Sequence, residues 1–529
     1  MPAAIDVLSD RRSAVAFWLG CAIVTAGVGL HLPMFLMGRH NHYVLAGMPM
    51  DGGMYVGMVA IVLGIALTGY GLLPKNLPSA DRVIEAILPP ENAPLTRRHW
   101  AMAMLLALAL VIDIMKPASL GFVTPGMRAE YGVGKAMVAW LPLAALCGTV
   151  VGSFAWGALA DLYGRRAAIL LSSVMFIGTS ICGAMPSFWW NVGMCFLMGA
   201  AAGGMLPVAY ALLAEIMPTR HRGWSLVLIG GIGAVGGVLA ASGLSALLQP
   251  TFGWRIMWFL NLPTGLLLIL MSPMLPESAR FLQQMGRGAE ARTMLAKFGV
   301  VAVVSGAPIE RTDHTHDYLP PAEHQFVGIT SALTLAAVAW GLINFGIMLW
   351  LPSALVAEGR SVAASSALIA QSTLIAAPTI LLSTWAYSAW STRGALMVMI
   401  AITGLGLVGI GLRNSGIAFF ANPVMDVTLL ILGSCGVISI LLPYTAENYP
   451  LRIRGRATGW IAGCSKLGGL IAQTLSVMGL APPLAAAALA IGVPVVVALV
   501  LIFRFGRETR GRDLRELETG MLGLNAPGR

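Results

Sequence analysis

Long apolar segments separated by short polar clusters run through this chain. A helix needs about 20 apolar residues to cross the hydrocarbon core of a bilayer, and fourteen segments reach this length. Two come first, at about 14–37 and 53–73. Six follow within about 100–274, and a further six lie between a polar stretch at about 275–325 and residue 504. The pattern predicts an all-α polytopic membrane protein.

Composition supports a membrane protein and excludes a water-soluble enzyme. Only 11% of the residues are charged and the mean hydropathy is +0.80, whereas soluble domains carry about 25% charged residues. The net charge of +10 does not indicate nucleic acid as a partner, because the basic residues are scattered among the predicted turns. All six cysteines fall inside apolar segments without paired spacing, so neither a disulfide framework nor a metal site is expected, and no cofactor is predicted.

The distribution of Lys and Arg predicts the orientation. If the N-terminus is cytoplasmic, 25 of the 33 Lys and Arg residues lie in cytoplasmic segments and six lie on the opposite side. Cytoplasmic segments of membrane proteins carry this excess of positive charge. We therefore expect an inner (plasma) membrane protein with both termini and the central polar stretch in the cytoplasm.

An internal repeat divides the chain into two similar parts. Glu215, Pro218, Arg222 and Gly223 follow the fourth of the six central spans, and the same residue types recur after the fourth of the last six spans, 232 positions later. A second pair of matching segments places its glutamates, Glu277 and Glu508, 231 positions apart. Such repeats indicate two equivalent structural halves. The predicted divisions are an extra N-terminal transmembrane hairpin at 1–74, a cytoplasmic linker at 75–98, a six-helix half at 99–274, a central cytoplasmic loop at 275–325, a second six-helix half at 326–505 and a cytoplasmic tail at 506–529.

The loop between the second and third central spans carries a recognisable motif, Gly157-Ala-Leu-Ala-Asp161-Leu-Tyr-Gly164-Arg165-Arg166. It resembles the signature loop of the major facilitator superfamily. With the repeated Glu-Pro-Arg-Gly corners, the chain over about 97–518 resembles the sugar-porter and metabolite:proton symporter branches of that superfamily. The resemblance implies alternating access, with a cytoplasmic gate whose charge contacts form in one transport state and break in the other.

We expect a separate role for each position of this loop. Gly157 allows a close approach of two helices, Asp161 interacts with the dipole of the following helix, and Gly164 permits a tight turn. The equivalent turn of the second half, Trp385–Gly394, has no acid at the Asp position, so the gate is expected to be asymmetric. The predicted gate residues are Gly157, Asp161, Gly164, Arg165, Arg166, Glu215, Arg222, Glu447 and Arg454.

Two charged residues lie in the first central span. Asp113 is about thirteen residues into the helix, roughly 20 Å deep at 1.5 Å per residue, and Lys116 shares its helix face. Pro117 removes the N–H that would bond the carbonyl of Asp113, so a kink is expected there. Intramembrane charges are usually functional. We therefore expect Asp113 to couple transport to protons and Lys116 to bind an anionic cargo; the alternative is an ion pair that only fixes helix packing.

Other polar residues within the spans are candidates for the cargo cavity. A basic residue at Lys466 either meets cargo from the second half or extends toward the cytoplasm. The remaining candidates have the alternative role of packed helix-interface residues. They are Gln473, Asn344, Gln371, Trp340, Tyr210 and Tyr444.

These observations predict a secondary active transporter that moves a small organic, anionic metabolite with protons by alternating access. No nucleotide-binding Gly-Lys-Ser/Thr loop is present, so ATP is not expected as the driver. The alternatives are a proton-driven exporter of drugs or metabolites, a non-transporting sensor of the same fold, and copper transport by the Met- and His-rich hairpin. The expected partners are the small-molecule substrate, protons and membrane lipid.

Overall fold

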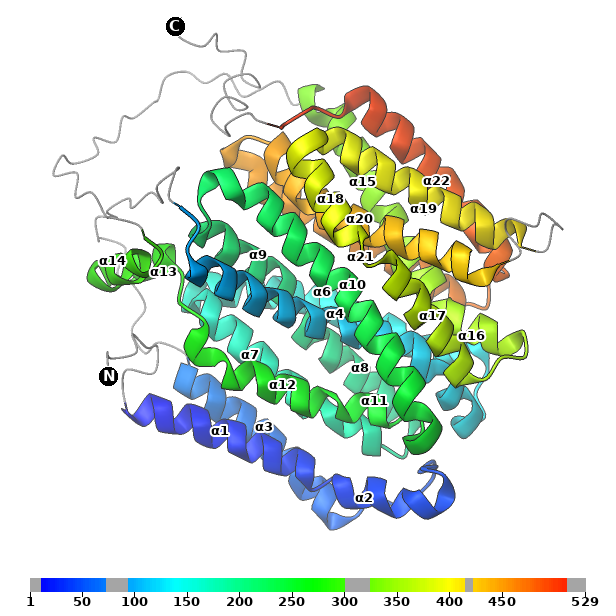
Figure 1. The fold of residues 1–529 in the computed structure, drawn as a ribbon. Helices are drawn as coiled ribbons and strands as arrows, with labels where there is room; N and C mark the ends of the chain where they lie inside the picture. The colour runs from blue at the N-terminus through cyan, green and yellow to red at the C-terminus, as the bar shows by residue number, and fades with distance from the viewer. Residues whose placement is uncertain (1–10, 73–93, 300–323, 414–421, 511–529) are drawn as a thin grey trace, which may run out of the picture.

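The computed structural model describes residues 11–72, 94–299, 324–413 and 422–510. Within these ranges the chain forms helices joined by short turns, without strands. Figure 1 shows two groups of tilted helices, one from the N-terminal and one from the C-terminal part of the chain, with the first two long helices along one edge. The predicted all-α, two-half architecture with an added hairpin is confirmed.

The added hairpin consists of two long helices with a helical cap between them. It packs against α7 through apolar side chains, with Phe17, Val24 and Ile61 in one core with Val174 and Ile177. The face of the N-terminal half that it covers lies away from the C-terminal half (Figure 1). Its elements are α1 (Arg11–Gly29), α2 (Leu32–Met37), η1 (Gly38–Asn41) and α3 (Gly52–Leu72).

A buried ion pair attaches the tip of the hairpin to the N-terminal half. Arg255 is fully buried, and its guanidinium lies 2.6 Å from the carboxylate of Glu130. The same carboxylate accepts hydrogen bonds from the backbone N–H groups of Leu45 and Ala46 in the hairpin, at 2.8 and 3.0 Å, and from the indole of Trp254 at 2.7 Å. Glu130 thus joins two distant parts of the chain, the hairpin tip at Leu45 and Ala46 and the turn at Trp254 and Arg255, which fixes the hairpin tip in place.

The N-terminal half contains six membrane-crossing segments, several of which are broken into two helices. Close packing within it depends on small residues: a Cβ at Gly148 or Gly152 of α6 would collide with the backbone of α8. The elements are α4 (Arg97–Tyr131), α5 (Lys135–Val138), α6 (Trp140–Tyr163), α7 (Arg165–Gly178), η2 (Thr179–Ala184), α8 (Phe188–Ala202), α9 (Met205–Ile216), α10 (Thr219–Phe252), α11 (Ile256–Phe259), α12 (Asn261–Leu270) and η3 (Ser272–Met274).

The central stretch, predicted as a polar loop, begins with two short helices, α13 (Ala279–Gln284) and α14 (Gly288–Lys297). Ser278 starts the first of them by accepting a hydrogen bond from the N–H of Phe281, the usual capping arrangement. The guanidinium of Arg98 in α4 donates to the carbonyl of Lys297 at 3.2 Å, which holds α14 against the bundle. Residues 300–323 lie outside the described part of the chain.

The C-terminal half repeats the arrangement of the first. Thirteen segments of the described chain are long and apolar enough to cross a membrane. The fourteenth predicted span corresponds to α21, whose basic and small polar residues lower its hydropathy, although it packs inside the bundle against α15 and α20. The elements are α15 (His324–Leu342), η4 (Ile343–Ile347), α16 (Met348–Ala357), α17 (Val362–Ala376), α18 (Thr379–Trp385), η5 (Ala386–Trp390), α19 (Thr392–Leu412), α20 (Pro423–Asn448), α21 (Leu451–Val477) and α22 (Leu484–Phe505).

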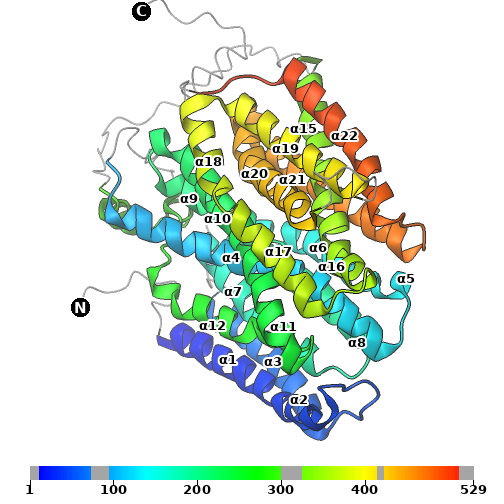
Figure 2. The ribbon, with the colours of Figure 1, turned by 45° about the vertical axis from the view of Figure 1, so that its right-hand side comes forward.

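The two halves contact each other through several pairs of helices. The N-terminal helix α10 contacts α17, α18 and α20, α4 contacts α16, and α6 contacts α21. Figure 2 shows α10, α4 and α17 together at this interface. We call the end of the bundle where α1 begins and α22 ends the terminal end, and the opposite end, which carries the hairpin tip and the α16–α17 turn, the distal end.

The hairpin should be dispensable for folding of the twelve-helix core. Because the surface of α7 that it covers is apolar, lipid chains can replace it, and Glu130 keeps its bonds to Arg255 and Trp254. Deletion of residues 1–74 should therefore leave a protein that inserts and elutes as a single species in detergent. Aggregation of the truncated chain, or its failure to insert, would show that the hairpin belongs to the core.

Candidate functional site

Three charged side chains converge at the interface between the halves. Asp113 and Lys116 are buried in α4, and the carboxylate of Asp113 interacts electrostatically with both Lys116 and Lys466 of α21. Lys466 thus comes from the opposite half of the protein. Formally the group carries one negative and two positive charges, and hence one net positive charge.

Two buried polar atoms of this charged group lack hydrogen-bond partners in the described part of the chain. Among the described residues, neither Oδ1 of Asp113 nor Nζ of Lys116 has a hydrogen-bond partner. The ammonium of Lys116 instead lies against the face of the Phe176 ring in α7, a cation–π contact. Asp113 and Lys116 therefore share a helix face, as predicted, without forming a direct ion pair. The helix α4 continues through Pro117 as far as Tyr131.

An irregular turn in the seventh core span faces Lys466. The segment η4 is a single π-helical turn, a distortion that is frequent at functional sites, and it places Phe345 between α15 and α16. The ammonium of Lys466 lies 4.7 Å from the centroid of the Phe345 ring. The amide of Gln473, two turns further along α21, donates to the carbonyl of Phe345, so Phe345 is held from both sides by residues of α21.

Glycine makes this proximity possible. A Cβ at Gly341 of α15 would collide with the carbonyl of Ser465, and one at Gly468 of α21 would collide with the carbonyl of Val338. The backbones of α15 and α21 therefore touch beside Lys466. This close approach brings the π-turn within reach of the lysine.

The other predicted cavity residues have different surroundings. Asn344 donates to the carbonyl of Trp340 at 3.1 Å, and the Trp340 indole donates to the carbonyl of Ser434 at 2.9 Å. Asn344 thus bonds within its own helix, in the π-turn, and Trp340 connects α15 to α20. They lie close to Phe345 but are not part of the charged group.

Three further candidates contact other parts of the protein. Tyr210 of α9 packs against Gly230 of α10, where an added Cβ would collide with the tyrosine hydroxyl. The Tyr210 side chain therefore lies between α9 and α10. Tyr444 is fully buried, and its hydroxyl donates to the backbone carbonyl of Arg507 at 2.7 Å, at the terminal end. Gln371 is exposed on α17, on the same face as Leu374.

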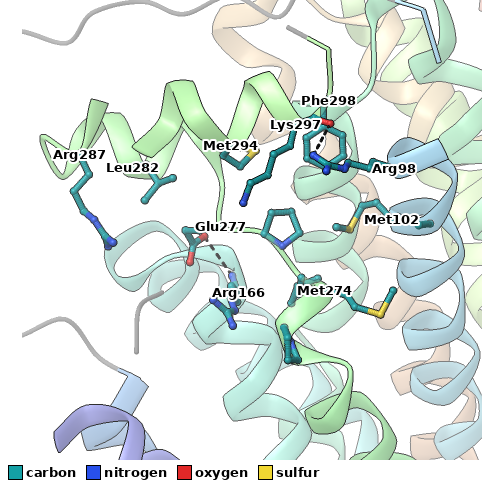
Figure 3. A pocket seen from close by; sticks show the side chains of 14 residues that line it. Arg98, Met102, Arg166, Met274, Glu277, Leu282, Arg287, Met294, Lys297 and Phe298 are labelled. Atoms are coloured by element: carbon teal, nitrogen blue, oxygen red, sulfur yellow. Dashed lines mark hydrogen bonds between the residues drawn. The ribbon is translucent and has the colours of Figure 1, made fainter. Parts of the chain in front are cut away.

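At the terminal end, the predicted gate loop is organised by a carboxylate from another segment. Gly164 has φ +102°, and a Cβ there would collide with the carboxylate of Glu277. The same carboxylate accepts hydrogen bonds from the N–H groups of Arg165 and Arg166, at 2.8 and 3.4 Å. Glu277 therefore caps the N-terminus of α7, where a negative charge is stabilised by the helix dipole. Figure 3 shows Glu277 facing Arg166 beside a cavity of about 320 Å³.

The side chain of Arg165 connects the loop to the neighbouring helix end. It lies 3.5 Å from Asp161 and 3.3 Å from Glu215, and the hydroxyl of Ser278 donates to Glu215. Three of the predicted gate residues, Asp161, Arg165 and Glu215, are thus brought together. Arg222 lies in the first turn of the next helix, α10, just after the corner.

Two expectations about individual residues of this loop are wrong. A Cβ at Gly157 would meet no atom within 4 Å, so no helix approaches closely there; the close approach in α6 occurs one and two turns earlier. Asp161 is 78% exposed and contacts Arg165, while the residue at the helix N-terminus is Glu277. A carboxylate distant in sequence occupies this position because the chain after η3 returns to the gate loop.

The second half carries an equivalent cap made with hydroxyl groups. The carboxylate of Glu508 accepts from the N–H and hydroxyl of Thr392, at 2.9 and 2.7 Å, at the start of α19. The hydroxyl of Thr509 donates to Glu447 at 2.6 Å, as that of Ser278 does to Glu215. The N–H that the glutamate caps belongs to Thr392 here and to Arg165 in the first half, so the side chains at this position differ in charge. The predicted asymmetry, which rests on the missing acid at the position of Asp161, stays a prediction.

One contact joins the two gate regions across the interface. A Cβ at Gly223 of α10 would lie 3.1 Å from Oε1 of Glu447 and 3.4 Å from the ring of Tyr387. The corner of the first half therefore rests directly on the carboxylate of the second half. Arg454, the counterpart of Arg222, begins α21 after the equivalent corner, and its side chain donates to the carbonyl of Tyr449 at 3.3 Å.

Several contributors were missed as site residues from the sequence alone. Glu277 and Glu508 were identified only as members of the repeat, and Thr392 and Thr509 were not singled out. The 231-residue offset that pairs the two glutamates also pairs Ser278 with Thr509, and it could have identified both caps. In the hairpin, His31 is buried and its ring bonds the carbonyl of Gly27; within the described ranges, no group of three or more His, Cys, Asp or Glu residues is arranged to hold a metal.

Two six-helix halves that enclose a buried charged group, with matching charged corners at one end, are the features of a polytopic membrane transporter. The model of the family described as Major Facilitator Superfamily matches residues 102–473. The chain therefore belongs to the Major Facilitator Superfamily, a family of transporters and not of enzymes. The predicted resemblance is confirmed.

Relatives and solved structures agree with this assignment. The chain is 25% identical to the niacin transporter NiaP of Acinetobacter baylyi, over 72% of this chain and 87% of that protein. It is 27% identical to the 4-hydroxybenzoate transporter PcaK of Pseudomonas putida, over 72% and 85%, and 25% identical to a gallate transporter of the same species, over 79% and 94%. Among solved structures, the xylose transporter XylE from E. coli in a partially occluded inward open conformation is similar in fold, with a TM-score of 0.63 at 16% identity, over 79% of this chain and all of that one.

The gate contacts predict a difference between two neutralising substitutions. Asp161 is largely exposed and pairs with Arg165 one turn away, a type of pair that contributes about 0.3–0.5 kcal/mol. Glu215 is far less exposed and also accepts from Ser278. Both Asp161→Asn and Glu215→Gln should loosen the terminal end, with the larger effect at Glu215.

The measurement is the rate of thiol labelling at a cysteine that replaces Ser439, in a background without other cysteines. Ser439 is fully buried, beside Gly230 at the interface between the halves. Labelling should be faster in both variants than in the parent. Unchanged labelling in Glu215→Gln, together with lost transport, would contradict a gating role.

The two caps should respond differently to pH. Burial raises the pKa of Glu277, and hydrogen bonds from the N–H groups of Ser278, Arg166 and Arg165 only partly oppose this rise. The folded protein therefore holds a proton on Glu277 more tightly than the unfolded chain does. The stability that this residue contributes is present at low pH and is lost as the pH rises through the folded-state pKa. The thermal stability of the parent relative to Glu277→Gln should fall as the pH rises from about 4.5 to 8.

Glu508 is the matched control. Burial alone would raise the pKa of Glu508, but hydrogen bonds from Ser391, Thr392 and the N–H of Arg510 outweigh it and hold the pKa below its ordinary value. Its carboxylate is ionised in both folded and unfolded chains above about pH 5. The difference in melting temperature between the parent and Glu508→Gln should therefore be constant over most of the range. Parallel pH trends for the two variants would contradict this account.

Proposed function

We propose that the protein is a secondary active transporter that moves a small aromatic carboxylate together with a proton by alternating access. The observation that carries this proposal is the electrostatic group of the buried Asp113 and Lys116 and the half-buried Lys466, which draws its members from both halves. A site shared by two halves is exposed to one side or the other when the halves rock. Its net positive charge suits a monoanion.

The names of the relatives support the class of cargo. Niacin, 4-hydroxybenzoate and gallate, the cargoes named for three of the relatives, are all small aromatic rings that carry one carboxylate. The site matches such a molecule: two ammonium groups for the carboxylate, and the Phe176 and Phe345 rings that those ammonium groups face. The ring of the cargo would then stack or pack against these side chains.

Coupling to protons follows from the crowding of two carboxylates. When a cargo carboxylate binds between Lys116 and Lys466, it lies next to Asp113, and two carboxylates at one buried site repel each other. Uptake of one proton by Asp113 relieves this repulsion. The group then has the same net charge empty and loaded, so the loaded carrier crosses between states without an additional buried charge.

The orientation in the membrane is part of the proposal. The terminal end, with the gate loop, both caps and α13–α14, carries most of the basic residues, and we place it in the cytoplasm by the positive-inside rule. The distal end, with the hairpin tip, then faces the periplasm or exterior. In this orientation the Arg165 contacts form the cytoplasmic gate.

The proposal is tested in proteoliposomes with labelled 4-hydroxybenzoate. Asp113→Asn should retain exchange of cargo but lose uphill accumulation driven by a pH gradient, because the carboxyl group can no longer take up and release a proton. Lys116→Ala and Lys466→Ala should lose anion binding. Gln371→Ala is the matched control, since Gln371 is exposed away from the group, and it should behave as the parent. Gradient-driven accumulation that survives in Asp113→Asn would contradict the coupling role.

A further inference from the structure

A second cavity lies at the distal end of the interface between the halves. Its volume is about 390 Å³, within the range of small-molecule sites. Residues of α4, α5 and α6 line one side, and residues of α16, α21 and α22 line the other. Like the buried charged group, it is therefore formed by both halves.

The charged residues of this cavity have one sign. Arg128 and Lys135 are the two charged side chains among the residues that line it, and no Asp or Glu is among them. Lys135 is exposed and Arg128 is half-buried. The nearest acid along α4, Glu130, is already engaged by Arg255 and Trp254, so it is not available to neutralise the cavity.

The polar atoms of the cavity also lack partners. Among the described residues, buried atoms without a hydrogen bond include Nε of Arg128, Nε1 of Trp350, Oγ of Ser353 and Oε1 of Gln473, and all four residues line this cavity. Buried polar groups are almost always satisfied by protein, water or ligand. Three of these atoms, on Arg128, Trp350 and Ser353, are N–H or O–H donors, and they come from both halves. The residues that line the cavity also include two cations and no acid. Unpaired donors beside cations are the groups that bind a carboxylate.

The cavity leads toward the buried charged group. Gln473 lines the cavity and donates to the carbonyl of Phe345, whose ring faces Lys466 on its other side. Lys466 and Gln473 are two helical turns apart on α21, which corresponds to about 10 Å. Leu120 and Leu349 pack with Phe345 at the base of the cavity. Phe345 and these leucines therefore separate the two sites.

We propose that this cavity is an anion-capture subsite, in which Arg128 and Lys135 hold the carboxylate of the cargo before Phe345 and its neighbours let it pass to Lys466. The inference rests on the proposed function. The apolar walls, which include Trp350 and Leu349, accommodate the aromatic ring while the cations hold the carboxylate. Capture here raises the local concentration of anions at the distal end and accelerates their entry.

The experiment measures initial rates of 4-hydroxybenzoate entry from the distal side in proteoliposomes. Arg128→Gln and Lys135→Gln should each raise KM by about tenfold, the effect of one charge-assisted hydrogen bond, with little change in kcat. The increase of KM with ionic strength should be weaker in the double variant than in the parent. Arg128→Lys keeps the positive charge, so its KM should be close to that of the parent and well below that of Arg128→Gln. A KM close to that of the parent also shows that a substitution at this position leaves the site folded.

Arg360→Gln is the matched control. Arg360 is an exposed basic residue of the α16–α17 turn at the same end, outside the cavity, and its loss should leave KM unchanged. KM values for Arg128→Gln and Lys135→Gln equal to that of Arg360→Gln would overturn the subsite. An effect that appears only in vesicles containing anionic lipid would also overturn it, because the cavity would then bind lipid headgroups.

A second readout separates this subsite from the proposed function. A cysteine at Ser353 should react with a membrane-impermeant thiol reagent added from the distal side, and 4-hydroxybenzoate should slow the reaction in the parent background but not with Arg128→Gln. Protection that is unaffected by Arg128→Gln overturns the subsite even if transport is normal. If the parent neither binds nor transports small aromatic carboxylates, the proposed function itself fails.

Discussion

An ionised side chain in the middle of a bilayer is costly unless other charges or a ligand balance it. Here the balance involves Asp113 and Lys116, which are buried, and the half-buried Lys466 of the other half. Two lysines against one acid leave a positive charge within the protein. We propose that this positive charge draws an anion to the group. When Asp113 takes up a proton together with the anion, the net charge of the group stays the same, so the two halves can move without an additional buried charge.

Two carboxyl groups at the terminal end lie at helix N-termini, where the helix dipole favours negative charge. Glu277 and Glu508 each cap the first turn of a helix, α7 and α19, in corresponding places of the two halves. The first half adds Arg165, which connects Asp161 to Glu215, whereas the second has the neutral Thr392. The contacts of Arg165 in the first half are therefore ion pairs, while those of Thr392 in the second half are hydrogen bonds. Glu447 lies beside Gly223 at the corner of the first half, so the two regions are in contact.

Patterns that extend over many residues predicted the architecture correctly. Fourteen apolar segments and a repeat at 231 and 232 positions were enough for the two halves and the hairpin. The buried charges of α4 were found because any acid or lysine in an apolar segment is unusual. The predictions that were wrong depended on contacts between distant segments. Gly157 was expected where two helices approach closely, but this approach lies one and two turns earlier in α6. Asp161 was expected at the N-terminus of the following helix, a position that Glu277 occupies. The π-turn at Phe345 and the burial of Arg255 also depend on packing, and no local pattern indicates them.

The central claim is that binding of an anion at the buried group brings a proton to Asp113. The most direct test is proton uptake on binding, measured with a pH-indicator dye when 4-hydroxybenzoate is added to purified protein in weakly buffered solution. The account predicts about one proton taken up per anion bound by the parent protein, and none by Asp113→Asn at the same occupancy. Saturable binding of the anion to the parent without any proton uptake would contradict it.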